Sequence, residues 1–77
     1  MYLLVITGDD LAIKFSRHAR EQMAERGVSE NEVEEAIKGG SKHLQFPNKI
    51  VADYKYFSVV YKKLGQDTFI ITVKPRW

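Results

Sequence analysis

The sequence predicts an α+β domain in which two N-terminal helices pack on one face of an antiparallel sheet of about four strands. Two segments with helix-capping residues, each ended by glycine, occupy residues 16–40, and runs rich in Val, Ile, Tyr and Phe follow. The chain has 77 residues, 44% of them hydrophobic, and no cysteine. This size predicts one domain spanning residues 1–77, with a small apolar core and no disulfide.

The first elements are predicted to be a hairpin and a short helix. Residues 2–7 are β-rich and residues 11–15 alternate apolar with polar or small side chains, while 8–10 supply turn residues. Ser16 then ends the second strand and caps a helix that stops at Gly27.

One face of this helix carries an arginine among apolar residues. Phe15, Ala19, Met23 and Arg26 fall on one stripe, and His18 lies roughly 80° from Arg26 around the helix axis. A desolvated guanidinium calls for an anion, either a carboxylate of the same protein or an external phosphate. Two interpretations remain open: Arg26 and His18 form a functional pair, or the arginine stem covers the core while the histidine caps or packs. Both predict a largely buried arginine stem.

The second helix has clearer end signals. Ser29 and Glu32 form a capping box, and Val28 and Val33 occupy the positions of a hydrophobic staple. Residues 39–40 are both glycine and end the helix. The glutamates along this helix are interpreted as a solvated face.

The remainder of the chain predicts an antiparallel meander. Strands are expected at 49–53, 57–64 and 68–74, with a hairpin turn over 64–67 and a short edge strand at 43–46. Simple alternation in the last strand puts Phe69, Ile71 and Val73 on one face and Ile70, Thr72 and Lys74 on the other. One face of the sheet would receive the helices, and the second would be an open platform.

Several classes of site are absent from the sequence. His18 and His43 have no partner at zinc-ligand spacing, and no P-loop, dinucleotide or nucleophile-elbow motif occurs. We therefore expect no metal and no cofactor. Since no apolar run approaches the roughly 20 residues that cross a bilayer, and the start lacks signal-peptide features, we expect a cytoplasmic protein without membrane contact.

Charge is divided unevenly along the chain. Residues 1–40 hold five basic and eight acidic side chains, whereas residues 41–77 hold seven basic and two acidic ones. A basic surface attracts nucleic acid through phosphate contacts. In 54–57 and 61–63 lysines interleave with aromatic residues, a pattern that fits base stacking but also fits ordinary cross-strand packing.

Motifs at both ends resemble one family. They are Phe15-Ser16-Arg17-His18-Ala19, Met23, Glu25-Arg26-Gly27-Val28-Ser29, Val33, Ala36-Ile37, Ile70-Ile71-Thr72-Val73 and Pro75-Arg76-Trp77. The pattern resembles domain-of-unknown-function family 4258. This resemblance implies a fold similar to RelE/ParE-like toxins and other small metal-independent ribonucleases, and it implies functional positions at His18, Arg26 and Thr72.

The leading functional hypothesis is an RNA-interacting, toxin-like domain that acts as a weak metal-independent endoribonuclease. In it His18 is the general acid or base, Arg26 stabilises the phosphorane, and Thr72 donates a hydrogen bond. The RNA backbone would be guided by Lys62, Lys74 and Arg76. The alternative is a non-catalytic module that binds another protein, such as an antitoxin or a second copy, through an exposed strand edge or aromatic face.

Overall fold

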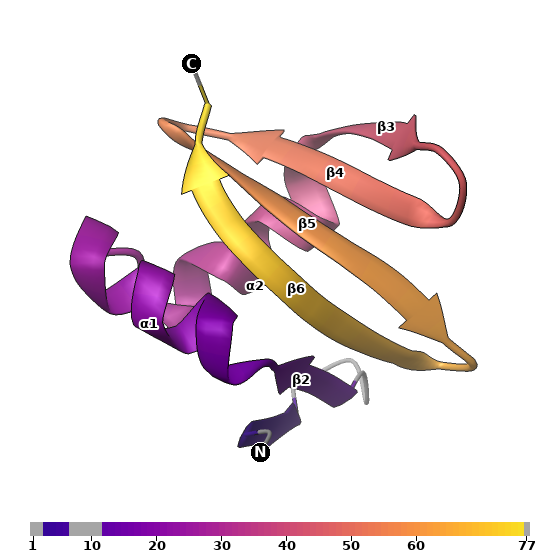
Figure 1. The fold of residues 1–77 in the computed structure, drawn as a ribbon, viewed down its shortest axis with the longest axis horizontal. Coiled ribbons are helices and arrows are strands. Elements are labelled where there is room, and N and C mark those ends of the chain that lie inside the picture. Colours follow the sequence, from indigo (N-terminus) through magenta and orange to yellow (C-terminus); the bar gives the residue numbers. More distant parts are fainter. Residues whose placement is uncertain (1–2, 7–11, 77) are drawn as a thin grey trace.

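The chain folds into two helices and one mixed sheet of six strands (Figure 1). A computed structural model describes residues 3–6 and 12–76. The elements are β1 (Leu3–Ile6), β2 (Ala12–Phe15), α1 (Arg17–Arg26), α2 (Glu30–Gly39), β3 (Ser41–Gln45), β4 (Lys49–Tyr54), β5 (Phe57–Leu64) and β6 (Asp67–Pro75). The α+β class with two helices ahead of the main strands is therefore confirmed. Within those residues, no helix is long and apolar enough to span a bilayer.

The sheet is larger than predicted and is not purely antiparallel. Its strand order is β1-β2-β6-β5-β4-β3. Strands β3 to β6 form the expected four-stranded antiparallel meander, but β2 pairs in parallel with β6, with residues 13–15 opposite 68–70. The N-terminal hairpin therefore extends the sheet, and the prediction of about four antiparallel strands is wrong. The predicted turn at 8–10 lies outside the described residues.

Both helices begin where their caps predict. The Ser16 hydroxyl accepts a hydrogen bond from the Ala19 N–H (3.0 Å), and Gly27 ends α1 in the left-handed region at φ 68°. At α2, Ser29 accepts from the Glu32 N–H (3.1 Å) while the Glu32 carboxylate accepts from the Ser29 N–H (3.1 Å). The predicted capping box is confirmed.

A steric limit requires glycine at position 40, where α2 ends. Gly40 has φ −77°, which any residue can adopt, so a left-handed turn is not the reason for glycine here. A Cβ at Gly40 would lie 2.6 Å from the carbonyl oxygen of Ala36 and 2.8 Å from that of Asp53. Only glycine lets the chain pass between α2 and β4 at this point.

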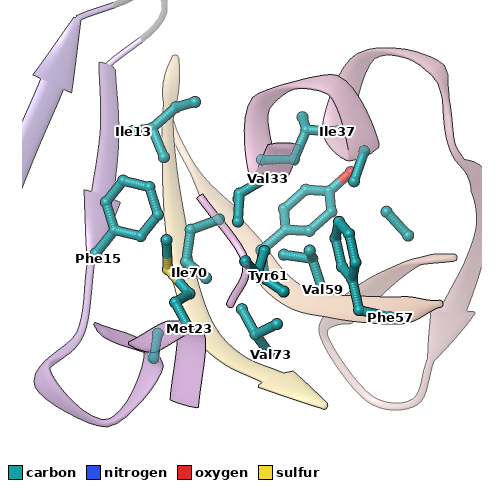
Figure 2. Packing of buried hydrophobic residues seen from close by; sticks show 14 residues of the cluster. Ile13, Phe15, Met23, Val33, Ile37, Phe57, Val59, Tyr61, Ile70 and Val73 are labelled. Carbon is teal, nitrogen blue, oxygen red and sulfur yellow. The ribbon is translucent and has the colours of Figure 1, made fainter. Parts of the chain in front are cut away.

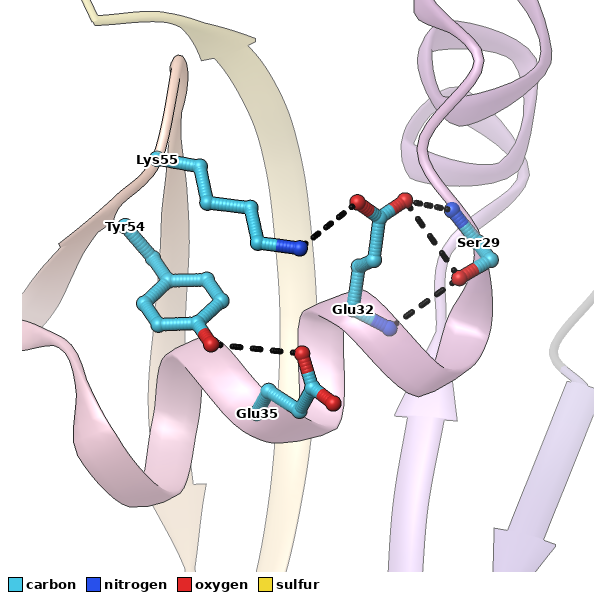
Figure 3. A network of polar contacts seen from close by, with 5 residues as sticks. All are labelled: Ser29, Glu32, Glu35, Tyr54 and Lys55. Carbon is cyan, nitrogen blue, oxygen red and sulfur yellow. Dashed lines mark hydrogen bonds and ion pairs between the residues drawn. The ribbon is translucent and has the colours of Figure 1, made fainter.

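The capping box also connects α2 to the turn between β4 and β5 (Figure 3). The Lys55 ammonium lies 3.4 Å from the second oxygen of Glu32, and the Tyr54 hydroxyl donates to Glu35 (3.3 Å). The hydrogen bond from the Ser29 N–H, helped by Lys55, lowers the pKa of Glu32 below its ordinary value. These contacts fix the second helix relative to the sheet.

The core lies between the helices and one face of the sheet (Figure 2). Alternate residues of β5, which are Phe57, Val59 and Tyr61, are at most 3% exposed and face Met23 of α1 and Val33 of α2. In Figure 1, α2 passes behind β5 and β6, which leaves the opposite face of these strands without a helix. The core thus leaves one sheet face open for function.

The residues of β6 do not alternate strictly between the two faces of the sheet. Tyr61 is opposite Ile70, but Val60 is opposite Thr72, so the register shifts by one residue at Ile71. Because of this β-bulge, Ile70 and Val73 both enter the core. The prediction that Val73 shares a face with Phe69 and Ile71, opposite Ile70, is therefore wrong.

Candidate functional site

The sequence-predicted Thr72 lies where α1 covers the edge of β6. Strand β2 pairs with β6 only as far as Ile70, so the outer edge of β6 beyond that residue faces α1. Gln22 of α1 fills this edge, because its Oε1 accepts from the Val73 N–H (3.0 Å) and from the Thr72 hydroxyl. The hydroxyl hydrogen of Thr72 is therefore engaged within the protein.

His18 and Arg26 lie one helical turn before and one turn after Gln22. His18 is exposed, whereas the Arg26 side chain is only 30% exposed and its Nη1 lies 3.5 Å from Oε1 of Glu25. The predicted burial and pairing of Arg26 are confirmed, and the partner is a carboxylate of the same protein. Its Nε is buried and has no hydrogen-bond partner in the described part of the chain.

The three predicted catalytic residues thus lie on α1 and on the neighbouring edge of β6 without converging on one point. Eight residues of helix separate His18 from Arg26 by about 12 Å along the axis. The engaged Thr72–Gln22 pair lies between them. The catalytic roles of these residues stay predictions, and the geometry favours a structural role for Gln22 and Thr72.

The predicted basic residues belong to the helix-free face. Lys74 is opposite Ser58 and Lys62 is opposite Phe69, both on the side away from the core. Arg76 follows β6, and its Nη1 donates to the carbonyl of Lys55 (3.2 Å).

The aromatic residues expected near these cations are mostly engaged elsewhere. Tyr61 is buried in the core, and Tyr54 contacts Glu35 and packs edge-on against Phe57. Only Tyr56, which is 41% exposed, keeps a substantial accessible surface among the tyrosines of these two segments. Ordinary packing therefore explains most of the interleaved pattern.

A hollow of about 460 Å³ opens on the helix-free face at the end of the sheet near the C-terminus. Its lining includes His43, Val51, Asp53, Ser58, Lys74 and Arg76. These residues come from β3, β4, β5, β6 and the segment after β6, which lie side by side in the sheet. The hollow therefore brings together an imidazole, a carboxylate, a hydroxyl and two cations.

A polar chain crosses the hollow. The Ser58 hydroxyl donates to Oδ1 of Asp53 (2.5 Å), and Oδ2 of Asp53 lies 3.8 Å from Nδ1 of His43. Ser58 is 3% exposed, while the His43 side chain is 58% exposed. The carboxylate lies on the Nδ1 side of the imidazole, which leaves Nε2 available to a ligand.

The order of the contacts limits the chemistry of these three side chains. Asp53 lies between Ser58 and His43, so the serine hydroxyl donates its hydrogen bond to the carboxylate and not to the imidazole. Ser58 therefore positions Asp53 and is not set up as a nucleophile. His43 can transfer protons to and from a ligand whose negative charge is matched by Lys74 and Arg76.

The rest of this face is also basic. Register and alternation put four lysines on it, which are Lys14, Lys49, Lys62 and Lys74. One of them, Lys14, is paired with Asp67 (3.1 Å). Six glutamates lie instead on the two helices. The two aspartates of the second half, Asp53 and Asp67, lie on the same face, so together with Arg76 this face carries a moderate positive excess.

Another hollow, of about 580 Å³, lies at the corner between the two helices. It is lined by Arg20 and Glu30, which form an ion pair with each other across the corner. Its charges are thus satisfied internally, and the hollow on the sheet face is the better candidate site.

Sequence reasoning missed His43, Asp53 and Ser58. In the sequence His43 has no partner at ligand spacing, so spacing alone does not identify it as a site residue. The available signal was the turn at 46–48, which sets Gln45 opposite Lys49 and hence His43 opposite Val51. No cluster of three His, Asp or Glu side chains suited to a metal occurs among residues 3–6 and 12–76.

Comparison with known proteins gives a family and no closer relative. No curated protein matches the chain, and no solved structure does. The family model described as Domain of unknown function (DUF4258) matches residues 15–74, which run from the last residue of β2 through most of β6. The match includes both helices and the residues of the hollow except Pro75 and Arg76. Because it covers most of the chain, this protein belongs to the DUF4258 family.

Proposed function

We propose that this domain binds single-stranded RNA in the cytoplasm across the helix-free face of its sheet and cleaves it without a metal in the hollow around His43. The observation that carries the proposal is the combination in one hollow of an imidazole beside a carboxylate with two flanking cations. Lys62 lies on the same face and would extend the contact with the backbone beyond the hollow.

The chemistry needs only proton transfer and charge stabilisation. His43 takes the proton from a ribose 2′-hydroxyl, and the oxygen so activated forms a bond to the adjacent phosphorus. The bond from phosphorus to the 5′-oxygen breaks, and that oxygen takes a proton from the Lys74 ammonium or from water. Lys74 and Arg76 stabilise the additional negative charge of the phosphorane. Asp53 acts through His43 as a positioning residue.

The proposal includes a relation to RelE/ParE-like toxins, as expected from the sequence. Its support is the order of elements, in which two helices precede a meander of four antiparallel strands whose open face is basic. In this domain the proton-transfer role moves from His18 to His43. The bonds from Gln22 of α1 to Thr72 and Val73 then hold β6 and its cations in place.

Cleavage of a labelled single-stranded oligonucleotide by the full chain tests the catalytic assignment. We expect His43→Ala to slow cleavage by about 10² to 10⁴-fold, the range for loss of a general acid or base, with little effect on binding. His18→Ala is the matched histidine control and should leave cleavage unchanged. EDTA should have no effect, because no step uses a metal.

Binding is tested by a salt titration of fluorescence anisotropy. Lys74→Ala should weaken binding and reduce the slope of log K against log salt by about 0.7, the value for one phosphate contact on a single strand. Arg17→Ala removes one equally positive charge from the exposed surface of α1, where the side chain is 84% exposed, and should leave the slope unchanged.

Two results would contradict the proposal in different ways. Loss of cleavage in His18→Ala with normal cleavage in His43→Ala would return the site to α1. Absence of any RNA binding at about 50 mM salt, where electrostatic attraction is strong, would remove the RNA function altogether.

A further inference from the structure

An apolar row crosses the sheet and ends in an exposed side chain. Cross-strand pairing puts Phe15 opposite Ile70, Ile70 opposite Tyr61, Tyr61 opposite Ile50 and Ile50 opposite Leu44. The first three are at most 3% exposed, Ile50 is half-buried against the core, and Leu44 is 82% exposed. The row is therefore covered by protein everywhere except at its last member, on β3.

Strand β3 is an edge with few of the usual protections. All five of its residues are exposed, and in the described part of the chain it pairs only with β4. Its outward N–H and C=O groups are consequently available for a further strand. Natural edges are commonly blocked by several charges or by proline within the strand, but β3 has only Lys42 as a permanently charged residue. Phe46, directly after the strand, is 93% exposed.

We propose that β3 pairs with β3 of a second copy of this chain, antiparallel and around a two-fold axis at Leu44. In this register Leu44 packs against Leu44 of the second copy. Lys42 lies opposite Phe46 of that copy, where its ammonium can contact the ring face, and His43 lies opposite Gln45. The apolar row then continues without interruption from one core into the other.

Charge and register both favour a second copy as the occupant. Strand β3 has one lysine and no carboxylate, so an acidic peptide would gain a single ion pair. The two-fold arrangement sets no like charges opposite each other, and it packs Leu44, the most exposed apolar side chain of the strand, against its own copy. A shift of the axis to His43 would set the two histidines opposite each other and Lys42 opposite Leu44, which breaks the row. The arrangement centred on Leu44 is the self-complementary one.

The same arrangement has a consequence for the sheet surface. Residues directly opposite in an antiparallel pair point to the same side, so the axis is perpendicular to the sheet. The helix-free faces of both copies then lie on one side, and neither hollow is covered. Self-pairing is therefore compatible with RNA binding but does not depend on it.

The absence of cysteine makes a direct test possible. In the proposed register the two Leu44 Cα atoms are about 4.5 to 5.5 Å apart, which suits a disulfide, whereas the two Lys42 Cα atoms are about 13 Å apart along the strands. We expect full-length Leu44→Cys to form disulfide-linked dimers on mild oxidation on the order of tenfold faster than Lys42→Cys. Lys42→Cys is a matched control on the same face of the same strand.

Sedimentation equilibrium of the cysteine-free chain completes the test. We expect a concentration-dependent dimer that is lost in Leu44→Lys, because this substitution sets two ammonium groups opposite each other, while thermal unfolding shows that the variant is folded. A chain that stays monomeric up to about 1 mM, the weakest affinity that is readily measured, would overturn the proposal. Equal cross-linking rates at positions 42 and 44 would overturn it as well, since they exclude this register.

Discussion

Gly40→Ala should destabilise the fold sharply although alanine is the better helix former. The added methyl group would lie 2.6 Å from the carbonyl oxygen of Ala36 and 2.8 Å from that of Asp53. Both atoms belong to the backbone, one in α2 and one in β4, so neither can rotate away as a side-chain end would. The helix end and the strand must therefore separate by several tenths of an ångström.

The magnitude follows from this overlap and from the size of the domain. Forcing one extra carbon into a packed site typically costs about 1 to 3 kcal/mol. For a domain of this length each kcal/mol lowers the melting temperature by about 4 to 8 °C. We therefore expect Gly40→Ala to lower the melting temperature by about 5 to 20 °C in thermal unfolding followed by circular dichroism.

The neighbouring glycine supplies the control. Gly39 is the last residue of α2, and a Cβ added there meets no atom within 4 Å. Gly39→Ala should therefore stabilise the protein by up to about 1 kcal/mol through helix propensity alone. Equal shifts in the two variants would refute the argument, because they would show that space around Gly40 does not decide its identity.

Three further predictions concern the caps and the seam between α1 and β6. Gln22→Ala should cost about 1 to 3 kcal/mol in urea unfolding, because the Val73 N–H loses its acceptor. Ser29→Ala removes half of the capping box and should cost about 0.5 to 2 kcal/mol, and an unchanged denaturation midpoint would show that the cap is dispensable. The pKa of Glu32 is lowered in the folded protein, so its ionised form stabilises the fold above the ordinary glutamate pKa. This contribution is lost as the pH falls below about 4.3. The melting temperatures of Glu32→Gln and of the original chain should therefore converge in acid.

The helices were predictable because their signals are local. Each end of a helix is marked by residues within one turn of that end: a cap with its bonding partner three residues later at the start, and a glycine at the close. Ser16, Gly27 and Ser29 have the roles that these signals predict. The hairpin turn containing Gly65 is likewise local, with φ 67° at the glycine.

The parallel pairing of β2 with β6 could not be obtained in the same way. It joins residues more than 50 positions apart, and nothing in either strand specifies its neighbour. The bulge at Ile71 could not be predicted from local sequence either, because simple alternation assumes an uninterrupted ladder of strand pairing. The extra residue becomes evident only because Ile70 and Val73 both pack into the core.

The residues of the hollow could not be predicted for a related reason. His18 and Arg26 are close in sequence and lie on one helix, so periodicity alone predicts that they are near each other. His43, Asp53 and Ser58 lie on three strands and become neighbours only when both strand registers are known. The partner of the His43 imidazole is a carboxylate ten residues away in the sequence, and it is close only in space.

One feature of the fold underlies both proposals. The helices occupy a single face of the sheet and carry six of the acidic side chains, so the other face is left open and basic. The helices also cover β4, β5 and β6 better than β3, and Leu44 is exposed where that cover ends. His43 and Leu44 are adjacent in β3, so their side chains point to opposite faces, one toward the hollow and one along the apolar row. His43→Ala should therefore slow cleavage without preventing self-association. Leu44→Lys should prevent self-association without slowing cleavage, which makes the two proposals separable within a single strand.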